Sequence, residues 1–234
     1  MDITKLNEDL QNFWNDEFKK LKSKKIIISE IKVESDLDKA IKFMGDNTNK
    51  LLDIGSGSGY ALFNAKILGN RLSYGLGIDS SINAIKFAIE TIKLSNIEGL
   101  DFKVADHNYL KKLKENSFDG IICSNVLDVI PKETANEIIN EIKRLLKTNG
   151  YLLLKFNFYL TKEIIEKNKM KEIEKNTYTL NGVLRGVNST IKEWLEKFQD
   201  FKIIKEAEYA RVKNGPKDRV LLLKNINRRN RNDW

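Results

Sequence analysis

Residues 51–59 have the sequence LLDIGSGSG, an apolar run that leads into a loop with three glycines. The run predicts a strand over 50–54, and the helical spacing of apolar residues after the loop predicts a helix over 61–68. Glycines at such a junction let the backbone turn tightly and approach a ligand, and the helix amino terminus favours a carboxylate or phosphate. This stretch therefore predicts a ligand-binding turn in an α/β fold.

Asp79 ends the next predicted strand, 73–78, twenty residues beyond Gly59. An acidic residue at that place accepts hydrogen bonds from ribose hydroxyls. The alternative is that Asp79 only caps the helix that starts near Ser81. Dinucleotide sites follow Gly-x-Gly-x-x-Gly or Ala, whereas the sixth position here is Tyr60 and the glycines follow Gly-x-Gly-x-Gly.

Strands and helices alternate along most of the chain, which implies parallel strands joined by right-handed crossovers, with helices on both faces of the sheet. The later predicted strands cover 100–105, 120–124, 151–156, 201–210 and 219–223. The later predicted helices run from Pro131 to Asn149-Gly150, over the polar segment 162–175, and around Trp194. A hairpin is predicted over 177–187, with its turn at Asn181-Gly182. The last two strands form an antiparallel pair that closes the sheet.

Composition excludes several classes of protein. The 234 residues hold one cysteine and no apolar run long enough for a membrane span, so a disulfide scaffold and a transmembrane protein are excluded. We expect a cytoplasmic location because the first residues are acidic rather than a signal sequence. The net charge of +8 is diluted along the chain apart from the tail at 226–234, so it is a weak indication of nucleic-acid binding.

Five stretches in order resemble the motifs of the class I S-adenosylmethionine-dependent methyltransferases, over roughly residues 35–225. They are LLDIGSGSG at 51–59, GID at 77–79, VAD at 104–106, SFDGIICSNVL at 117–127 and LLKTNGY at 145–151. The resemblance implies a Rossmann-like, doubly wound sheet of seven strands, mostly parallel with an antiparallel last strand. It also implies S-adenosylmethionine as cofactor and S-adenosylhomocysteine as product.

The resemblance also assigns cofactor-binding residues. The glycine loop lies beside the methionine part of the cofactor, Asp79 binds the ribose, Asp106 reaches the adenine amino group, and the fourth strand runs under the methyl-transfer site. The residues implied are Asp53, Gly55, Ser56, Gly57, Gly59, Asp79, Ser80, Asp106, His107, Ser124 and Asn125.

Catalytic residues are harder to assign, because methyl transfer needs chiefly an oriented nucleophile. If a proton must leave, His107, Asp128 and Tyr109 are the candidate bases by motif position. His107 is alternatively a helix-start residue beside the adenine, and Asp128 a favourable charge near a helix amino end. No Cys/His cluster has metal-ligand spacing, so we predict no metal.

The acceptor is indicated mainly by missing motifs. The fourth strand lacks the Asn/Asp-Pro-Pro-aromatic tetrapeptide that follows it in many amine methyltransferases for nucleic acids and proteins, and a Pro-Cys pair is also missing. The chain thus resembles the branch that acts on small molecules. Candidate acceptor residues are Trp14, Phe18, Phe158, Tyr159, Tyr178 and Arg185, with core packing or a solvated charge as the alternative roles.

We therefore expect one methyltransferase domain over 1–234, acting on an O, N or C nucleophile of a small molecule. Its parts are a helical cap (1–46), a cofactor core (47–157), an insertion (158–188), a closing segment (189–225) and a basic tail (226–234). The alternatives are an RNA methyltransferase and a non-catalytic interaction module that keeps the fold. The oligomeric state does not follow from the sequence.

Overall fold

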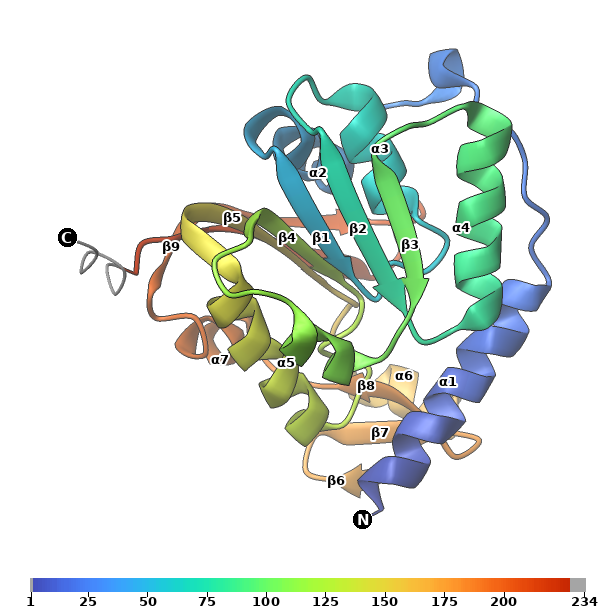
Figure 1. Ribbon diagram of the computed structural model, residues 1–234. Helices are drawn as coiled ribbons and strands as arrows, with labels where there is room; N and C mark the ends of the chain where they lie inside the picture. Colours follow the sequence, from blue (N-terminus) through green and yellow to red (C-terminus); the bar gives the residue numbers. More distant parts are fainter. Residues whose placement is uncertain (1, 228–234) are drawn as a thin grey trace.

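A seven-stranded sheet organises the computed structural model, which describes residues 2–227 (Figure 1). The strand order is β3-β2-β1-β4-β5-β10-β9. The strands are β1 (Lys50–Ile54), β2 (Tyr74–Asp79), β3 (Leu100–Val104), β4 (Phe118–Ser124), β5 (Leu146–Phe156), β9 (Phe201–Ala210) and β10 (Lys217–Asn225). Strands β1 to β5 pair in parallel, so their carboxyl ends meet at one edge of the sheet.

The last strand, β10, runs antiparallel between β5 and β9. The predicted fold class, with a mostly parallel sheet and an antiparallel last strand, is confirmed. The strand order reverses between β1 and β4, and ligands of such sheets bind outside the carboxyl ends at this point.

Helices cover both faces of the sheet. The longer ones are α1 (Ile3–Lys19), α2 (Asp36–Asn47), α3 (Tyr60–Leu68), α4 (Ile82–Ser95) and α5 (Lys132–Leu145); the shorter ones are α6 (Lys162–Lys167), α7 (Ile191–Glu196), η1 (Ile28–Glu30) and η2 (His107–Lys112). Because side chains alternate along a strand, Leu51 packs in the core under α2, α3 and α4, while Leu52 packs in the core under α5 and α7.

The insertion after β5 is a small antiparallel sheet of β6 (Lys171–Glu174), β7 (Thr177–Leu180) and β8 (Val183–Val187). The predicted hairpin is confirmed, with Asn181 and Gly182 at positive φ in its turn. The predicted helix over 162–175 was wrong in its second half, because the chain turns after α6 and β6 pairs with β7. Backbone pairing with the hairpin overrides the helical propensity of this polar segment.

The end of α5 also differs from the prediction. The helix ends at Leu145 rather than at Asn149-Gly150, and β5 starts directly at Leu146. Asn149 has a φ of 64°, so its left-handed turn lies within the start of β5 instead of capping the helix.

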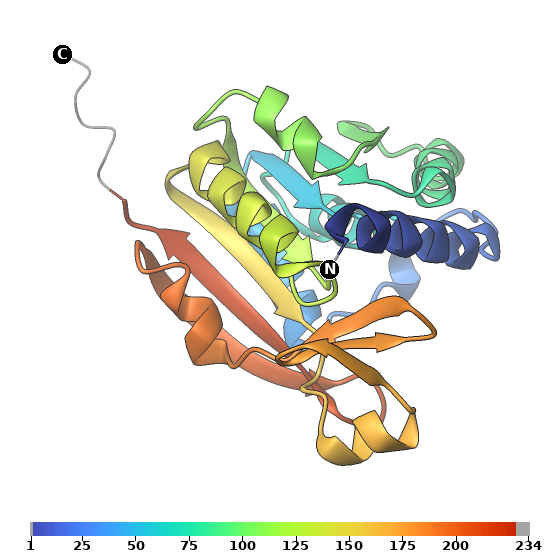
Figure 2. The ribbon, with the colours of Figure 1, turned by 90° about the horizontal axis from the view of Figure 1, so that it is seen from below.

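Helix α1 lies across the carboxyl edge of the sheet, between α4 and the small sheet (Figure 2). Gln11 Nε2 donates to Ser80 O at 2.9 Å, and Asn7 Nδ2 donates to Thr134 Oγ1 at 3.2 Å. These bonds tie α1 to the end of β2 on one side and to α5 on the other. Within residues 2–227, no helix is long and apolar enough to cross a membrane.

Candidate cofactor and acceptor site

A cavity of about 650 Å³ lies at the carboxyl ends of β1 to β4, beneath α1. Its size is typical of small-molecule sites, which span about 300–1,000 Å³. Lining it are Thr4, Asn7, Glu8, Leu10, Gln11, Trp14, Phe18, Asp53, Ile54, Gly55, Ser56, Gly57, Ser58, Tyr60, Ala61, Ile78, Asp79, Ser80, Ala105, Asp106, His107, Asn108, Ser124, Asn125, Val126, Val129, Ile130, Thr134 and Ile138.

The glycine loop between β1 and α3 forms one wall. Gly55, Gly57 and Gly59 all have positive φ, which L side chains rarely adopt. A Cβ at position 55 would lie 2.3 Å from Val126 Cγ2, so the loop also approaches the segment after β4 too closely for any side chain there. The sequence prediction of a tight turn is confirmed at all three glycines.

Asp79 fastens this loop to the start of α4. One carboxylate oxygen accepts from Gly57 N at 2.9 Å and the other from Ser81 N at 2.8 Å. The Asp79 side chain therefore lines the cavity and contacts the residue that precedes α4. The alternative that Asp79 caps this helix is wrong, because Ser81 is the N-cap and its side chain accepts from Ala84 N. Burial raises the pKa of Asp79, and the two backbone bonds oppose that rise.

Asp53 and Ser56 carry buried polar atoms without a partner. Asp53 Oδ2 and Ser56 Oγ lack a hydrogen bond, although the residues are only 2% and 8% exposed. Burial, and then the nearby charge of Asp79, raise the pKa of Asp53 well above its ordinary value. An unpaired buried carboxylate is costly, so this wall of the cavity suits a ligand with an ammonium group and hydrogen-bond donors. The amino acid part of S-adenosylmethionine has that ammonium.

Asp106 and His107 line the cavity beyond β3. Asp106 caps η2 by accepting from Asn108 N at 2.9 Å. His107 Nε2 lies 3.7 Å from the Glu137 carboxylate, which also pairs with Lys111. Thus His107 both starts a helix, as the alternative interpretation held, and faces the cavity.

Ser124 and Asn125 line the cavity at the end of β4. Asn125 has a φ of 56° and its backbone N donates to Lys155 O at 2.8 Å. Lys155 Nζ donates to Asn125 Oδ1 at 2.7 Å, which holds the side-chain amide in one orientation.

Asp128, the other predicted base, is not among the lining residues. It is buried, and its carboxylate accepts from Asn157 N at 2.7 Å and faces the Asn157 amide. Burial raises its pKa. Its contacts tie the segment after β4 to the end of β5. Tyr109 is likewise outside the cavity lining, and its ring lies under Lys103 Nζ at 4.4 Å.

The predicted acceptor residues separate into two groups. Trp14 and Phe18 line the cavity, whereas the lining does not include Phe158, Tyr159, Tyr178 or Arg185. The half-buried Arg185 guanidinium lies 4.7 Å from the ring centre of Phe13 and 5.6 Å from that of Trp14. Arg185 thereby packs β8 against α1.

Sequence reasoning missed much of the acceptor side. The polar residues of α1 that line it are Thr4, Asn7, Glu8 and Gln11, and α5 adds Thr134 and Ile138. A signal existed in α1. Successive members of the series Thr4, Asn7, Gln11, Trp14 and Phe18 are three or four residues apart, which places them on one helix face.

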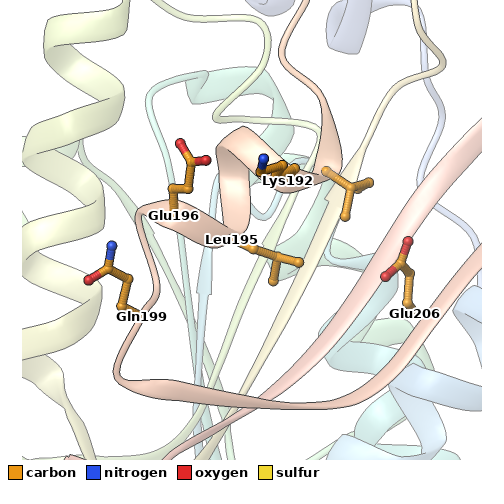
Figure 3. A pocket seen from close by; sticks show the side chains of 6 residues that line it. Lys192, Leu195, Glu196, Gln199 and Glu206 are labelled. Atoms are coloured by element: carbon orange, nitrogen blue, oxygen red, sulfur yellow. The ribbon is translucent and has the colours of Figure 1, made fainter.

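A second hollow of about 540 Å³ lies between α7 and β9 (Figure 3). Ile191, Lys192, Leu195, Glu196, Gln199 and Glu206 line it. It lies beside β9, at the edge of the sheet that is distant from β1 and β2. No residue of the glycine loop lines it. It is therefore separate from the cofactor cavity.

The sheet order, the glycine loop and the acidic residue that ends β2 define the class I S-adenosylmethionine-dependent methyltransferases. A methyltransferase domain family model matches residues 45–208. The chain belongs to this family, and S-adenosylmethionine is its cofactor.

Two curated relatives each match somewhat less than half of the chain. A ribosomal protein L11 methyltransferase from Fusobacterium nucleatum is 35% identical over 109 residues, 46% of this chain and 33% of the relative. A ubiquinone biosynthesis O-methyltransferase from Xanthomonas oryzae is 31% identical over 111 residues, 45% of this chain and 41% of the relative. The match thus spans well under half the length of these relatives.

Solved structures share the fold over more of the chain. The 1,6-didemethyltoxoflavin-N1-methyltransferase of Burkholderia thailandensis, with 1,6-didemethyltoxoflavin and S-adenosylhomocysteine bound, has a TM-score of 0.67 at 13% identity over 97% of this chain and 92% of its own. A Methanosarcina mazei S-adenosylmethionine-dependent methyltransferase has a TM-score of 0.64 at 23% identity over 80% of this chain and 96% of its own. At such identities the likeness concerns the fold alone.

The ribose assignment of Asp79 makes a first prediction. Asp79→Asn keeps the shape and one acceptor but removes the charge, so S-adenosylhomocysteine should bind about tenfold more weakly, as for loss of one charge-assisted bond. Isothermal titration calorimetry measures the change. Unchanged affinity would remove Asp79 from the ribose site.

Proposed function

We propose that this protein transfers the methyl group of S-adenosylmethionine to a small-molecule acceptor bound beneath α1. The observation that carries the proposal is one continuous cavity. It joins the glycine loop, with its unpartnered Asp53 and Ser56, to an apolar space under Trp14, Val126 and Val129. The likeness to a small-molecule methyltransferase over nearly the whole chain also supports it.

The cofactor, when bound, would supply a methyl group that is activated by its positively charged sulfur. The protein's own residues then have three tasks. Asp53 and the loop glycines hold the amino acid part, Asp79, Ser80 and Asp106 hold the nucleoside part, and α1 with the segment after β4 orients the acceptor and excludes water. Orientation of this kind contributes up to about 7–11 kcal/mol to lowering a barrier.

Of the candidate bases, His107 is the one we retain, because it lines the cavity whereas Asp128 and Tyr109 do not. Its Nε2 lies 3.7 Å from the Glu137 carboxylate. The division into cap, core, insertion and closing segment belongs to the same proposal. Of the basic tail, residues 228–234 lie outside the described part of the chain.

The test is a screen of small molecules for S-adenosylmethionine-dependent release of S-adenosylhomocysteine. Gly55→Val is the inactive control, because its side chain would collide with Val126. Product release with an acceptor, lost in the control, supports the proposal. Binding of S-adenosylhomocysteine without transfer to any acceptor would favour the non-catalytic interaction module, and transfer only to RNA would favour the RNA alternative.

A further inference from the structure

The cavity differs sharply in charge from the rest of the chain. The chain holds 41 lysines and arginines in 234 residues, so about five would be expected among 29 lining residues. Among residues 2–227, none of the lining residues is a lysine or an arginine. The lining instead contains four carboxylates, those of Glu8, Asp53, Asp79 and Asp106.

Three of these carboxylates belong to the cofactor side. Asp79 and Asp106 accept backbone hydrogen bonds next to the strand ends, and Asp53 lies buried beside the glycine loop. Glu8 lies elsewhere, on the face of α1 that also carries Asn7 and Gln11. It is exposed, and its carboxylate makes no hydrogen bond or ion pair within residues 2–227.

Three cations contact lining residues, but each is engaged. Lys111 Nζ donates to Asn108 Oδ1 at 3.2 Å and pairs with Glu137 at 2.8 Å. Lys155, which orients Asn125, forms a buried ion pair with Asp218 at 2.7 Å. Arg185 lies over the rings of Phe13 and Trp14 and is not itself a lining residue. The wall that an acceptor meets therefore presents carboxylates, amides, hydroxyls, apolar groups and the His107 imidazole.

We infer that the acceptor is a positively charged amine with a compact apolar or aromatic body, a conclusion that rests on the proposed methyltransferase function. An anionic acceptor would meet the carboxylate of Glu8 and no lysine or arginine among the lining residues, and like-charge contacts oppose binding. Trp14, Val129 and Ile130 provide the apolar surface.

The cationic form serves binding, and the neutral amine reacts. The ammonium loses its proton to His107, the base retained above, and the nitrogen lone pair then forms the bond to the methyl carbon as the carbon–sulfur bond breaks and its electron pair returns to sulfur. Glu8 is placed to attract the ammonium as it enters because its carboxylate is exposed and unpaired. Nucleic-acid phosphates would be repelled by the same wall, which argues against the RNA alternative despite the net charge of +8.

The experiment uses the full chain saturated with S-adenosylhomocysteine and three probes that share one ring system. Tryptamine is a cation, indole is neutral and indole-3-acetate is an anion. We expect tryptamine to bind most tightly, and at least roughly tenfold more tightly than indole-3-acetate, because the probes differ chiefly in charge. Calorimetric titration gives each affinity.

Glu8→Gln is the specific variant, and Asp9→Asn is its matched control because it removes the same charge from α1 at a position outside the cavity lining. Glu8→Gln should weaken tryptamine binding roughly fivefold, the upper end for a partly exposed ion pair, and leave indole unchanged. Asp9→Asn should change neither. Tighter or equal binding of indole-3-acetate, equal effects of the two variants, or no binding of tryptamine would overturn the inference. Failure to bind S-adenosylhomocysteine itself would instead refute the proposed function.

Discussion

Replacing Asp53 by Asn should weaken the binding of S-adenosylhomocysteine about a hundredfold at neutral pH. The substitution preserves shape but removes the buried charge that faces the ammonium of the ligand, and a hydrogen bond to a charged group contributes about 1.5–3 kcal/mol. Asp53 Oδ2 is otherwise without a partner, so no other contact compensates. Calorimetric titration of the wild type and of Asp53→Asn measures the difference.

The pH dependence of binding gives the same prediction a second readout. Burial and Asp79 raise the pKa of Asp53 above its ordinary value of 3.8, so the free protein keeps this proton at pH values where an exposed aspartate has lost it. Binding should therefore strengthen as the pH rises through that raised pKa. The stability of the free protein should fall as the pH rises from the ordinary aspartate pKa of 3.8 toward the raised pKa, because only the unfolded chain releases the proton in that interval. A pH profile that Asp53→Asn leaves unaltered would contradict the assignment.

Asp218→Asn should lower the free energy of unfolding by about 3–5 kcal/mol, the cost of leaving a buried charge unpaired. The Asp218 carboxylate is fully buried, pairs with Lys155 and with Arg211, and accepts from Phe158 N at 3.1 Å. Asparagine can replace the hydrogen-bond acceptor, but it leaves both cations without a counter-charge. Burial already lowers the pKa of Lys155, which shows how unfavourable its charge is at this place.

Urea unfolding measures this effect, with Asp46→Asn as the control. Asp46 pairs with Lys42 on the surface of α2, where both side chains remain partly exposed, and its loss should cost about 1 kcal/mol or less. The double variant Lys155→Met with Asp218→Leu should recover part of the lost stability, since both charges are removed together. Equal destabilisation by Asp218→Asn and Asp46→Asn would show that the buried pair contributes no more than an exposed one.

Local signals in the sequence were sufficient for the strands of the main sheet and for the tight turns beside the cavity. The glycines at 55, 57 and 59 are required by positive φ, and Asn181-Gly182 makes the hairpin turn. Each of these features depends on residues close together in the chain, so its physical cause is visible in a short stretch of sequence.

Features that depend on distant contacts could not be predicted. The helical pattern over 162–175 gives no sign that β6 pairs with β7. Asp128, predicted as a base or alternatively as a helix-end charge, instead accepts from Asn157 N, which lies 29 residues further along the chain. Similarly, the polar face of α1 becomes part of the cavity only because Asn7 and Gln11 fasten that helix across the sheet edge.

Titration of S-adenosylhomocysteine into the full chain tests most directly whether the glycine-loop cavity is a methyltransferase cofactor site. One saturable site per chain is predicted, with binding lost in Gly55→Val because position 55 has no room for a side chain beside Val126. NAD should not bind, since Tyr60 stands where a dinucleotide loop needs a small residue. Absence of S-adenosylhomocysteine binding, or binding that Gly55→Val leaves intact, would contradict this assignment.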